Sequence, residues 1–200
     1  MNIIQKVTSG LLLLSLAGCG KPGRLSPAAY VQYLESEKHP YLRKVVAGAY
    51  EYTIQLATPE YMACKEQPEN DSARKARIAE LKPYRFFLLK MNATEAQRKA
   101  AGGAMNDQRI AEADAMVAYY DQAAAADISL KAGMQALQPV TYHFEHNYGL
   151  APHNTIVVAF ETGADPQDLE LSFNDRFRNI PHIQASFSKQ EQLALPVLNN

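Results

Sequence analysis

Tryptophan is missing from this chain of 200 residues, and cysteine occurs only at Cys19 and Cys64. Exposed tryptophan rings are a common means of stacking on sugars, so their absence weighs against a glycan-binding role. The 11 tyrosines keep that role open.

An excess of charge of one sign is also missing. The chain has 20 basic and 21 acidic residues, and its formal net charge is −1. Proteins that bind nucleic acid through its phosphates carry a strongly basic surface. We therefore expect no nucleic-acid partner.

The short motifs of common enzyme families do not occur in the sequence. There is no Gly-x-Ser-x-Gly, no His-Glu-x-x-His, no phosphate-binding glycine loop and no dinucleotide-binding fingerprint. We expect no enzymatic activity, and we assign no catalytic residue and no cofactor. An active site assembled from distant residues stays open.

The longest apolar run is too short to cross a membrane. It extends from about Val7 to Ala17 and follows a single early charge, Lys6. A membrane-spanning helix needs about 20 apolar residues, whereas a positive start, a short apolar core and small residues at its end are typical of a secretory signal. Residues 1–18 are therefore predicted to be a signal peptide.

The end of this run, Leu16-Ala17-Gly18-Cys19, resembles the lipobox of bacterial lipoproteins. The resemblance implies that Cys19 becomes the mature N-terminus and carries acyl chains such as palmitate. It also leaves Cys64 as the only other thiol, which excludes an internal disulfide, and we expect Cys64 to be a small buried residue. An ordinary cleaved signal that happens to contain a cysteine is the alternative.

The residues that follow Cys19 bear on the destination of a lipoprotein. In that family an aspartate directly after the cysteine favours retention in the inner membrane, and acidic residues nearby favour surface export in Bacteroidota-type bacteria. Residues 20–24 read Gly-Lys-Pro-Gly-Arg. The resemblance thus implies a lipid anchor in the outer membrane, with the domain facing the periplasm.

The remaining chain is predicted to form one globular domain, residues 26–200, on a short tether, residues 19–25. About 175 residues suit a single domain with its own core. Fully extended, the seven residues from Cys19 to Ser26 reach roughly 25 Å, so the domain is expected to lie close to the membrane.

Alternating apolar residues predict strands, and helix-start patterns predict helices in the first two thirds of the chain. Ser26-Pro27 and Thr58-Pro59 are typical helix starts, and residues 50–56 and 84–91 indicate strands. Four later runs read as an antiparallel meander, and they cover residues 140–146, 156–160, 169–173 and 183–187. The predicted fold class is α+β, an antiparallel sheet or sandwich of about six to seven strands.

Three of the five histidines lie within eleven residues, at His143, His146 and His153. Catalytic zinc needs three nitrogen or oxygen ligands and one open position. On a strand, however, His143 and His146 would point to opposite faces. A metal-dependent hydrolase built on these histidines is therefore the weakest of the functions considered, and no metal ligand is assigned.

Two aromatic residues enclose a polar trio in Phe173-Asn174-Asp175-Arg176-Phe177. Asp175 is expected to accept a hydrogen bond from Arg176 or to cap a turn. Residues 61–66, 143–149 and 172–177 resemble segments of envelope lipoproteins of Bacteroidota-type bacteria. That loose resemblance implies an envelope lipoprotein and no particular activity.

These observations favour a lipid-anchored protein of the bacterial cell envelope with a non-enzymatic structural or accessory role. Its expected contacts are the membrane, through the N-terminal lipid, and an envelope protein bound at a sheet edge. The main alternative is a lipoprotein that binds a small apolar or sugar ligand between sheet and helices.

Overall fold

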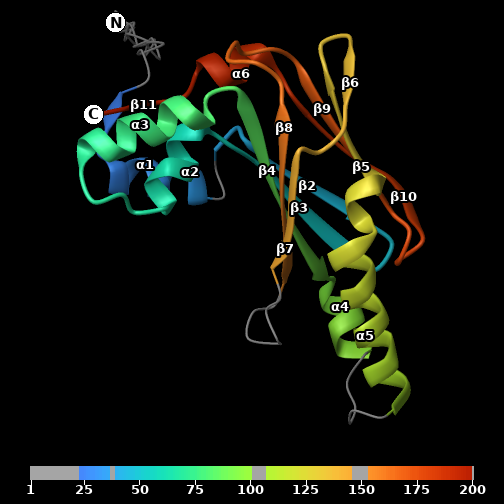
Figure 1. Cartoon of the computed structure of the whole chain (residues 1–200). Helices are drawn as coiled ribbons and strands as arrows, with labels where there is room; N and C mark the ends of the chain where they lie inside the picture. Colours follow the sequence, from blue (N-terminus) through green and yellow to red (C-terminus); the bar gives the residue numbers. More distant parts are fainter. Residues whose placement is uncertain (1–22, 37–38, 101–106, 146–152, 200) are drawn as a thin grey trace, which may run out of the picture.

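The structure, a computed structural model, describes residues 23–36, 39–100, 107–145 and 153–199. Two antiparallel sheets face each other, and helices lie at both ends of this sandwich (Figure 1). The α+β class is therefore confirmed. The described residues form 11 strands, more than the expected six to seven, because several strands are only two to six residues long.

The larger sheet has five strands in the order β2-β3-β4-β8-β7. All of its neighbouring strands are antiparallel. Its members are β2 (Leu42–Ala47), β3 (Tyr50–Ala57), β4 (Tyr84–Ala93), β8 (Asn154–Glu161) and β7 (Thr141–Glu145).

The smaller sheet has four strands in the order β10-β9-β5-β6 and is also antiparallel. Its members are β10 (Ile180–Phe187), β9 (Leu169–Asp175), β5 (Ile128–Ala132) and β6 (Gln135–Leu137). The expected meander of the last four runs is wrong, because β7 and β8 belong to the larger sheet and β9 and β10 to the smaller one. Alternation of apolar residues predicts which side chains of a strand are buried, but it does not determine which strands pair with each other.

The core lies between the facing sides of the two sheets. Phe87 in the larger sheet packs edge-on against Phe160, with ring centroids 5.9 Å apart, and meets Phe187 of the smaller sheet at 5.8 Å. Tyr52 meets Phe173 edge-on at 6.3 Å. Because these rings come from both sheets, they hold the sandwich together by burying apolar surface.

Three helices cover the outer face of the larger sheet at one end, α1 (Pro27–Glu35), α2 (Pro59–Lys65) and α3 (Asp71–Leu81). Side chains of Ser26, Thr58 and Asn70 cap their N-termini, and the first two are the expected helix starts. Gln55 on the outer face of β3 donates to the Leu34 carbonyl of α1 at 2.9 Å, which fixes α1 against the sheet.

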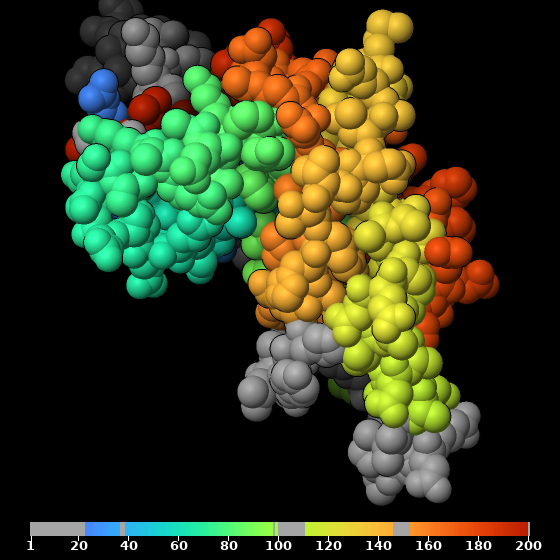
Figure 2. Space-filling view, in the orientation of Figure 1, coloured from blue at the N-terminus to red at the C-terminus, as the bar shows by residue number. Residues whose placement is uncertain are grey.

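At the opposite end lie α4 (Glu95–Ala100) and α5 (Asp107–Gln122), followed by the short 3₁₀ helix η1 (Ala124–Asp127). Figure 2 shows the coloured, yellow-green part of α5 extending past the end of β7. Of residues 111–122 in α5, Tyr120 is the one that is buried. This residue connects α5 to the interior.

The two described ends of the chain pair with each other. The parallel strands β1 (Arg24–Leu25) and β11 (Val197–Leu198) form a two-stranded sheet, and β11 follows the short helix α6 (Lys189–Leu193). Two backbone hydrogen bonds complete the pairing, Val197 N–H to the Gly23 carbonyl at 3.1 Å and Asn199 N–H to the Leu25 carbonyl at 2.7 Å. The fold therefore includes the last two residues of the expected tether.

A buried carboxylate connects the sheets and α5. Asp175, at the end of β9, has 0% exposure. The hydroxyls of Tyr52 in β3 and Tyr120 in α5 each donate to its Oδ2 atom at 2.7 Å. Arg178 donates to Oδ2 through Nη1 at 2.9 Å and to Oδ1 through its backbone N–H at 3.1 Å.

The guanidinium of Arg178 is almost as buried as its partner, with 6% of the side chain exposed. It lies over the Tyr50 ring at 4.4 Å and the Tyr120 ring at 5.1 Å, at distances suited to cation–π attraction. Burial alone would lower the pKa of Arg178, but the Tyr120 and Asp175 contacts outweigh it and raise that pKa. Arg178 therefore stays charged, and the Asp175 carboxylate lies in contact with it.

We expect Asp175→Ala to lower the free energy of unfolding by about 3–5 kcal/mol, because it leaves the Arg178 charge buried without a counterion. Tyr120→Phe removes one hydrogen bond and keeps the ring, and its expected loss is about 1–3 kcal/mol. The exposed Asp114 of α5 provides a control, since Asp114→Ala should change stability by less than about 0.5 kcal/mol. Urea denaturation at neutral pH measures all three. A loss at Asp175 no larger than at Asp114 would contradict this account.

Candidate functional site

A pocket of about 310 Å³ is lined by residues of α1, α2, α6 and β11 and of the start of β4. This volume is at the lower end of the range for small-molecule sites. Its walls are largely apolar, including Leu56, Pro59, Leu195 and Leu198. The pocket is the best candidate binding site among the described residues.

One buried cation lines this pocket. Arg85, at the start of β4, is only 8% exposed. Its guanidinium donates to backbone carbonyls alone: Nη1 to Lys82 at 3.1 Å and to Tyr84 at 3.0 Å, and Nη2 to Ala164 at 3.0 Å. In the described part of the chain it forms no ion pair with a carboxylate.

The electrostatics of the pocket follow from this placement. Burial lowers the pKa of Arg85, and the more distant charges of Glu60 and Asp165 partly oppose the effect. The guanidinium nevertheless stays protonated, as arginine does in proteins. Lys82 adds an exposed cation and Glu60 a half-buried carboxylate to the lining, so the lining side chains carry a net charge of +1.

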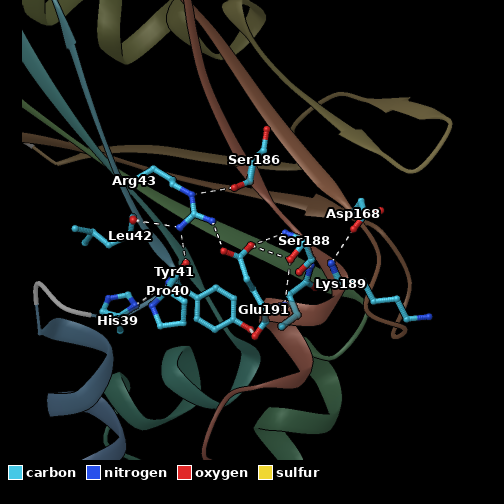
Figure 3. Close-up of polar contacts among 11 residues, drawn as sticks. His39, Pro40, Tyr41, Leu42, Arg43, Asp168, Ser186, Ser188, Lys189 and Glu191 are labelled. Carbon is cyan, nitrogen blue, oxygen red and sulfur yellow. Dashed lines mark hydrogen bonds and ion pairs between the residues drawn. The ribbon is translucent and has the colours of Figure 1, made fainter. Parts of the chain in front are cut away.

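Helix α6 forms one wall, and a salt bridge fastens it to β2 (Figure 3). Arg43 Nη2 lies 2.7 Å from Glu191 Oε1, and Arg43 Nε donates to the Ser186 carbonyl at 3.0 Å. Glu191 also forms a capping box with Ser188, accepting its backbone N–H at 2.7 Å. Burial would raise the pKa of Glu191, but the bonds from Ser188 and Arg43 hold it below its ordinary value.

Tyr41 connects this wall to the pocket. Its ring lines the pocket, and its hydroxyl donates to the Glu191 carbonyl at 3.1 Å. The backbone N–H of Tyr41 donates to Nδ1 of His39 at 3.1 Å. His39 is 4% exposed, and among the described residues its Nε2 atom has no partner at good hydrogen-bond geometry. Burial and the nearby Arg43 lower the pKa of His39.

The histidines considered for a metal site lie elsewhere. His143 is exposed on β7 and His153 precedes β8, while His146 lies outside the described residues. Among the residues that the structure does describe, no group of three or more His, Cys, Asp and Glu side chains is placed to hold a metal ion. The hydrolase therefore stays an untested prediction.

The structure describes Cys64 and leaves Cys19 outside the described residues. The lipidation of Cys19 therefore stays a prediction. Cys64 is half-buried on α2, and burial raises the pKa of its thiol. A raised pKa disfavours the thiolate, which is the reactive form.

The polar trio is arranged differently from the expected pair. Arg176 is an exposed residue whose Nε lies 2.6 Å from Asp127 Oδ2, whereas Asp175 pairs with Arg178. Side chains of neighbouring residues on a strand point to opposite faces, so Asp175 and Arg176 separate at the end of β9. The expected turn cap is confirmed, because Asp175 Oδ1 accepts the Arg178 backbone N–H.

Sequence reasoning missed Arg85 and Lys82. The strand predicted over residues 84–91 is confirmed. Arg85 is buried by a loop 79 residues further along the chain, and the residues around Arg85 in the sequence do not indicate that contact. Lys82 is the exposed residue that directly follows α3. Only the tertiary contacts bring the two cations to one pocket.

Comparison of the sequence with protein-family models finds no matching family, and no curated protein and no solved structure matches the chain. None of the described helices combines the length and apolar character that spanning a membrane requires.

The buried His39 predicts a loss of stability in mild acid. Its pKa is lowered in the folded state and lies near 6.5 in the unfolded chain, so below pH 6.5 the unfolded chain binds more protons. The free energy of unfolding should fall as the pH drops from 7.5 to 5.5, by up to about 1.4 kcal/mol per pH unit between the two pKa values.

Denaturation midpoints at the two pH values check this, with His39→Asn as the diagnostic variant. Its side-chain oxygen replaces the Nδ1 acceptor without titrating, so this variant should lose less stability on acidification than the wild type. The exposed His143→Asn provides the matched control and should behave like the wild type. Equal acid sensitivity of wild type and His39→Asn would exclude His39 as the cause.

Proposed function

We propose that this protein is a lipid-anchored component of the bacterial cell envelope with a non-enzymatic, accessory binding role. The observation that carries the proposal is the pairing of β1 with β11. It starts the folded domain at Arg24, only five residues after Cys19, a span of roughly 17 Å when fully extended. A domain anchored at Cys19 would therefore lie against the membrane surface.

The sequence around the anchor supports the outer membrane and the periplasmic side. Residues 20–24 contain two basic residues and no acidic one. Basic residues next to a lipid anchor are attracted to anionic headgroups. Arg24 is exposed on β1, so its charge is available for such a contact.

An envelope protein is the proposed partner, and the edge of the smaller sheet offers it a place to bind. Strand β6 is the edge strand of that sheet, and Gln135 and Ala136 on it are exposed. Met134, in the turn before β6, has 100% exposure. Edge strands carry unpaired backbone groups that a partner strand can use.

Binding of a small ligand is the second candidate function, and the 310 Å³ pocket favours it. The pocket combines apolar walls with a buried Arg85, which is the usual composition of small-ligand sites. The two functions are compatible, since the pocket and β6 involve different parts of the fold.

Replacing Cys19 tests the anchor. Cys19→Ala should abolish incorporation of a palmitate analogue and release the protein from the membrane fraction, because a single change removes the acylated thiol. Cys64→Ala is the matched control and should keep both. Labelling of the Cys19→Ala variant would contradict the anchor, whereas labelling lost in Cys64→Ala would move the modification to Cys64.

Photocrosslinking from β6 tests the partner. A photoreactive residue at Gln135, in the lipidated protein in intact cells, should capture one envelope protein, because this position lies on the open edge. The same residue at the exposed Lys75 of α3 should not capture it, and neither should the Cys19→Ala form. Equal capture from both positions, or from neither, would contradict binding at this edge.

A further inference from the structure

We propose that the pocket lined by Arg85 binds a small amphiphilic anion, one carboxylate or phosphate group on a short apolar chain. This inference deepens the second proposed function, ligand binding, and does not depend on the lipid anchor. Its basis is a buried cation in an apolar pocket that has no carboxylate in direct contact among the described residues.

Arg85 differs from the other buried arginines in having no carboxylate in contact among the described residues. Three described arginines are largely buried, Arg74, Arg85 and Arg178. Arg74 pairs with Asp71 at 2.9 Å and Arg178 with Asp175 at 2.9 Å. In the described part of the chain, Arg85 has only carbonyl acceptors. Removing a charge from water is costly unless a counterion compensates it, so an anion in the pocket would be stabilised by Arg85.

The guanidinium of Arg85 is held in a fixed position at the pocket. An arginine has five N–H donors, and three hydrogen bonds to carbonyls fix Arg85 in place. The bonds hold the side chain rigid in the wall of the pocket, so little conformational entropy is lost on binding. Arginine is also well suited to carboxylate and phosphate groups, which it can bind with two donors.

Three charged side chains belong to the lining of the pocket. Lys82 and Arg85 contribute two positive charges to the lining and Glu60 one negative charge. A ligand with one negative charge would neutralise the lining. A phosphate monoester carries a charge of about −1.5 to −2 at neutral pH, so it would neutralise the lining and leave a small negative excess beside Glu60.

The border of the pocket is apolar and partly exposed next to the anion site. Leu193 and Val197 at the pocket have 60% and 53% exposure, and together with Pro196 they form an apolar border on the side of α6 and β11. An apolar chain that continues from the anionic group would cover these residues, at about 25 cal/mol for each Å² of apolar surface buried. The pocket thus favours an amphiphile over a free inorganic anion.

Thermal shift and calorimetric titration of the full chain carrying Cys19→Ala test the proposal without an attached lipid. The probes are octanoate, hexyl phosphate, uncharged octanol and inorganic phosphate. Octanoate or hexyl phosphate should raise the melting temperature, whereas octanol and inorganic phosphate should have little effect. Binding of octanoate alone would point to a free carboxylic acid as the natural ligand, and binding of hexyl phosphate alone to a phosphorylated lipid.

Variants of the two cations locate the site. Arg85→Gln should weaken binding of the amphiphile roughly ten- to hundredfold, as expected for loss of a charge-assisted hydrogen bond. Because Arg85 also fixes three carbonyls, the exposed Lys82→Glu provides a variant with little risk to folding and should weaken binding several-fold. Lys75→Glu, also exposed and on α3, is its matched control and should bind like the wild type.

The outcomes separate the two proposals. Equal binding of octanol and octanoate, or wild-type affinity in a folded Arg85→Gln and in Lys82→Glu, would overturn the anion site and leave ligand binding standing. Absence of binding by every probe would overturn both the anion site and the ligand-binding function. The proposed envelope partner is tested separately by crosslinking from β6.

Discussion

The buried pair of Asp175 and Arg178 is the interaction on which the arrangement of this sandwich depends. Residues of β3, α5 and the β9–β10 turn contact the pair through hydrogen bonds. Strand β4 also reaches it, because Arg178 Nη1 lies 3.4 Å from the Met91 sulfur. A buried carboxylate without these donors would be unstable. The two sheets and α5 must therefore be placed so that the Tyr52 hydroxyl, the Tyr120 hydroxyl and Arg178 all reach the Asp175 carboxylate.

At the other end, the fold depends on contacts between distant parts of the chain. The strand pair β1–β11, the salt bridge from Arg43 to Glu191 and the Tyr41 hydroxyl all bring the C-terminal residues back to the start of the domain. The pocket is formed by this return, since α6 and β11 supply one of its walls. Its shape is thus coupled to the same segment that would lie nearest the membrane.

The sequence was sufficient to predict the local structure, but it did not indicate which strands pair with each other. Period-two alternation identified β3 and β4, and capping patterns identified α1 and α2, because both signals arise from neighbouring residues. The division of the last four strands between two sheets was missed, since alternation carries no information on pairing. The short strands β1, β6 and β11 have too few residues to show a period. Arg85 was missed for a related reason, because its burial depends on Ala164, far along the chain.

The contrast between the buried arginines separates a structural role from a binding role. Arg178 has a carboxylate, a hydroxyl and two aromatic rings around it, so its charge is satisfied within the fold and needs nothing from outside. Arg85 is equally rigid but lacks a carboxylate among the described residues, and it borders open space. If Arg85 served stability alone, an apolar residue of similar size would avoid the desolvation cost. The position of the Arg85 charge at a pocket is better explained by a ligand that supplies the negative charge.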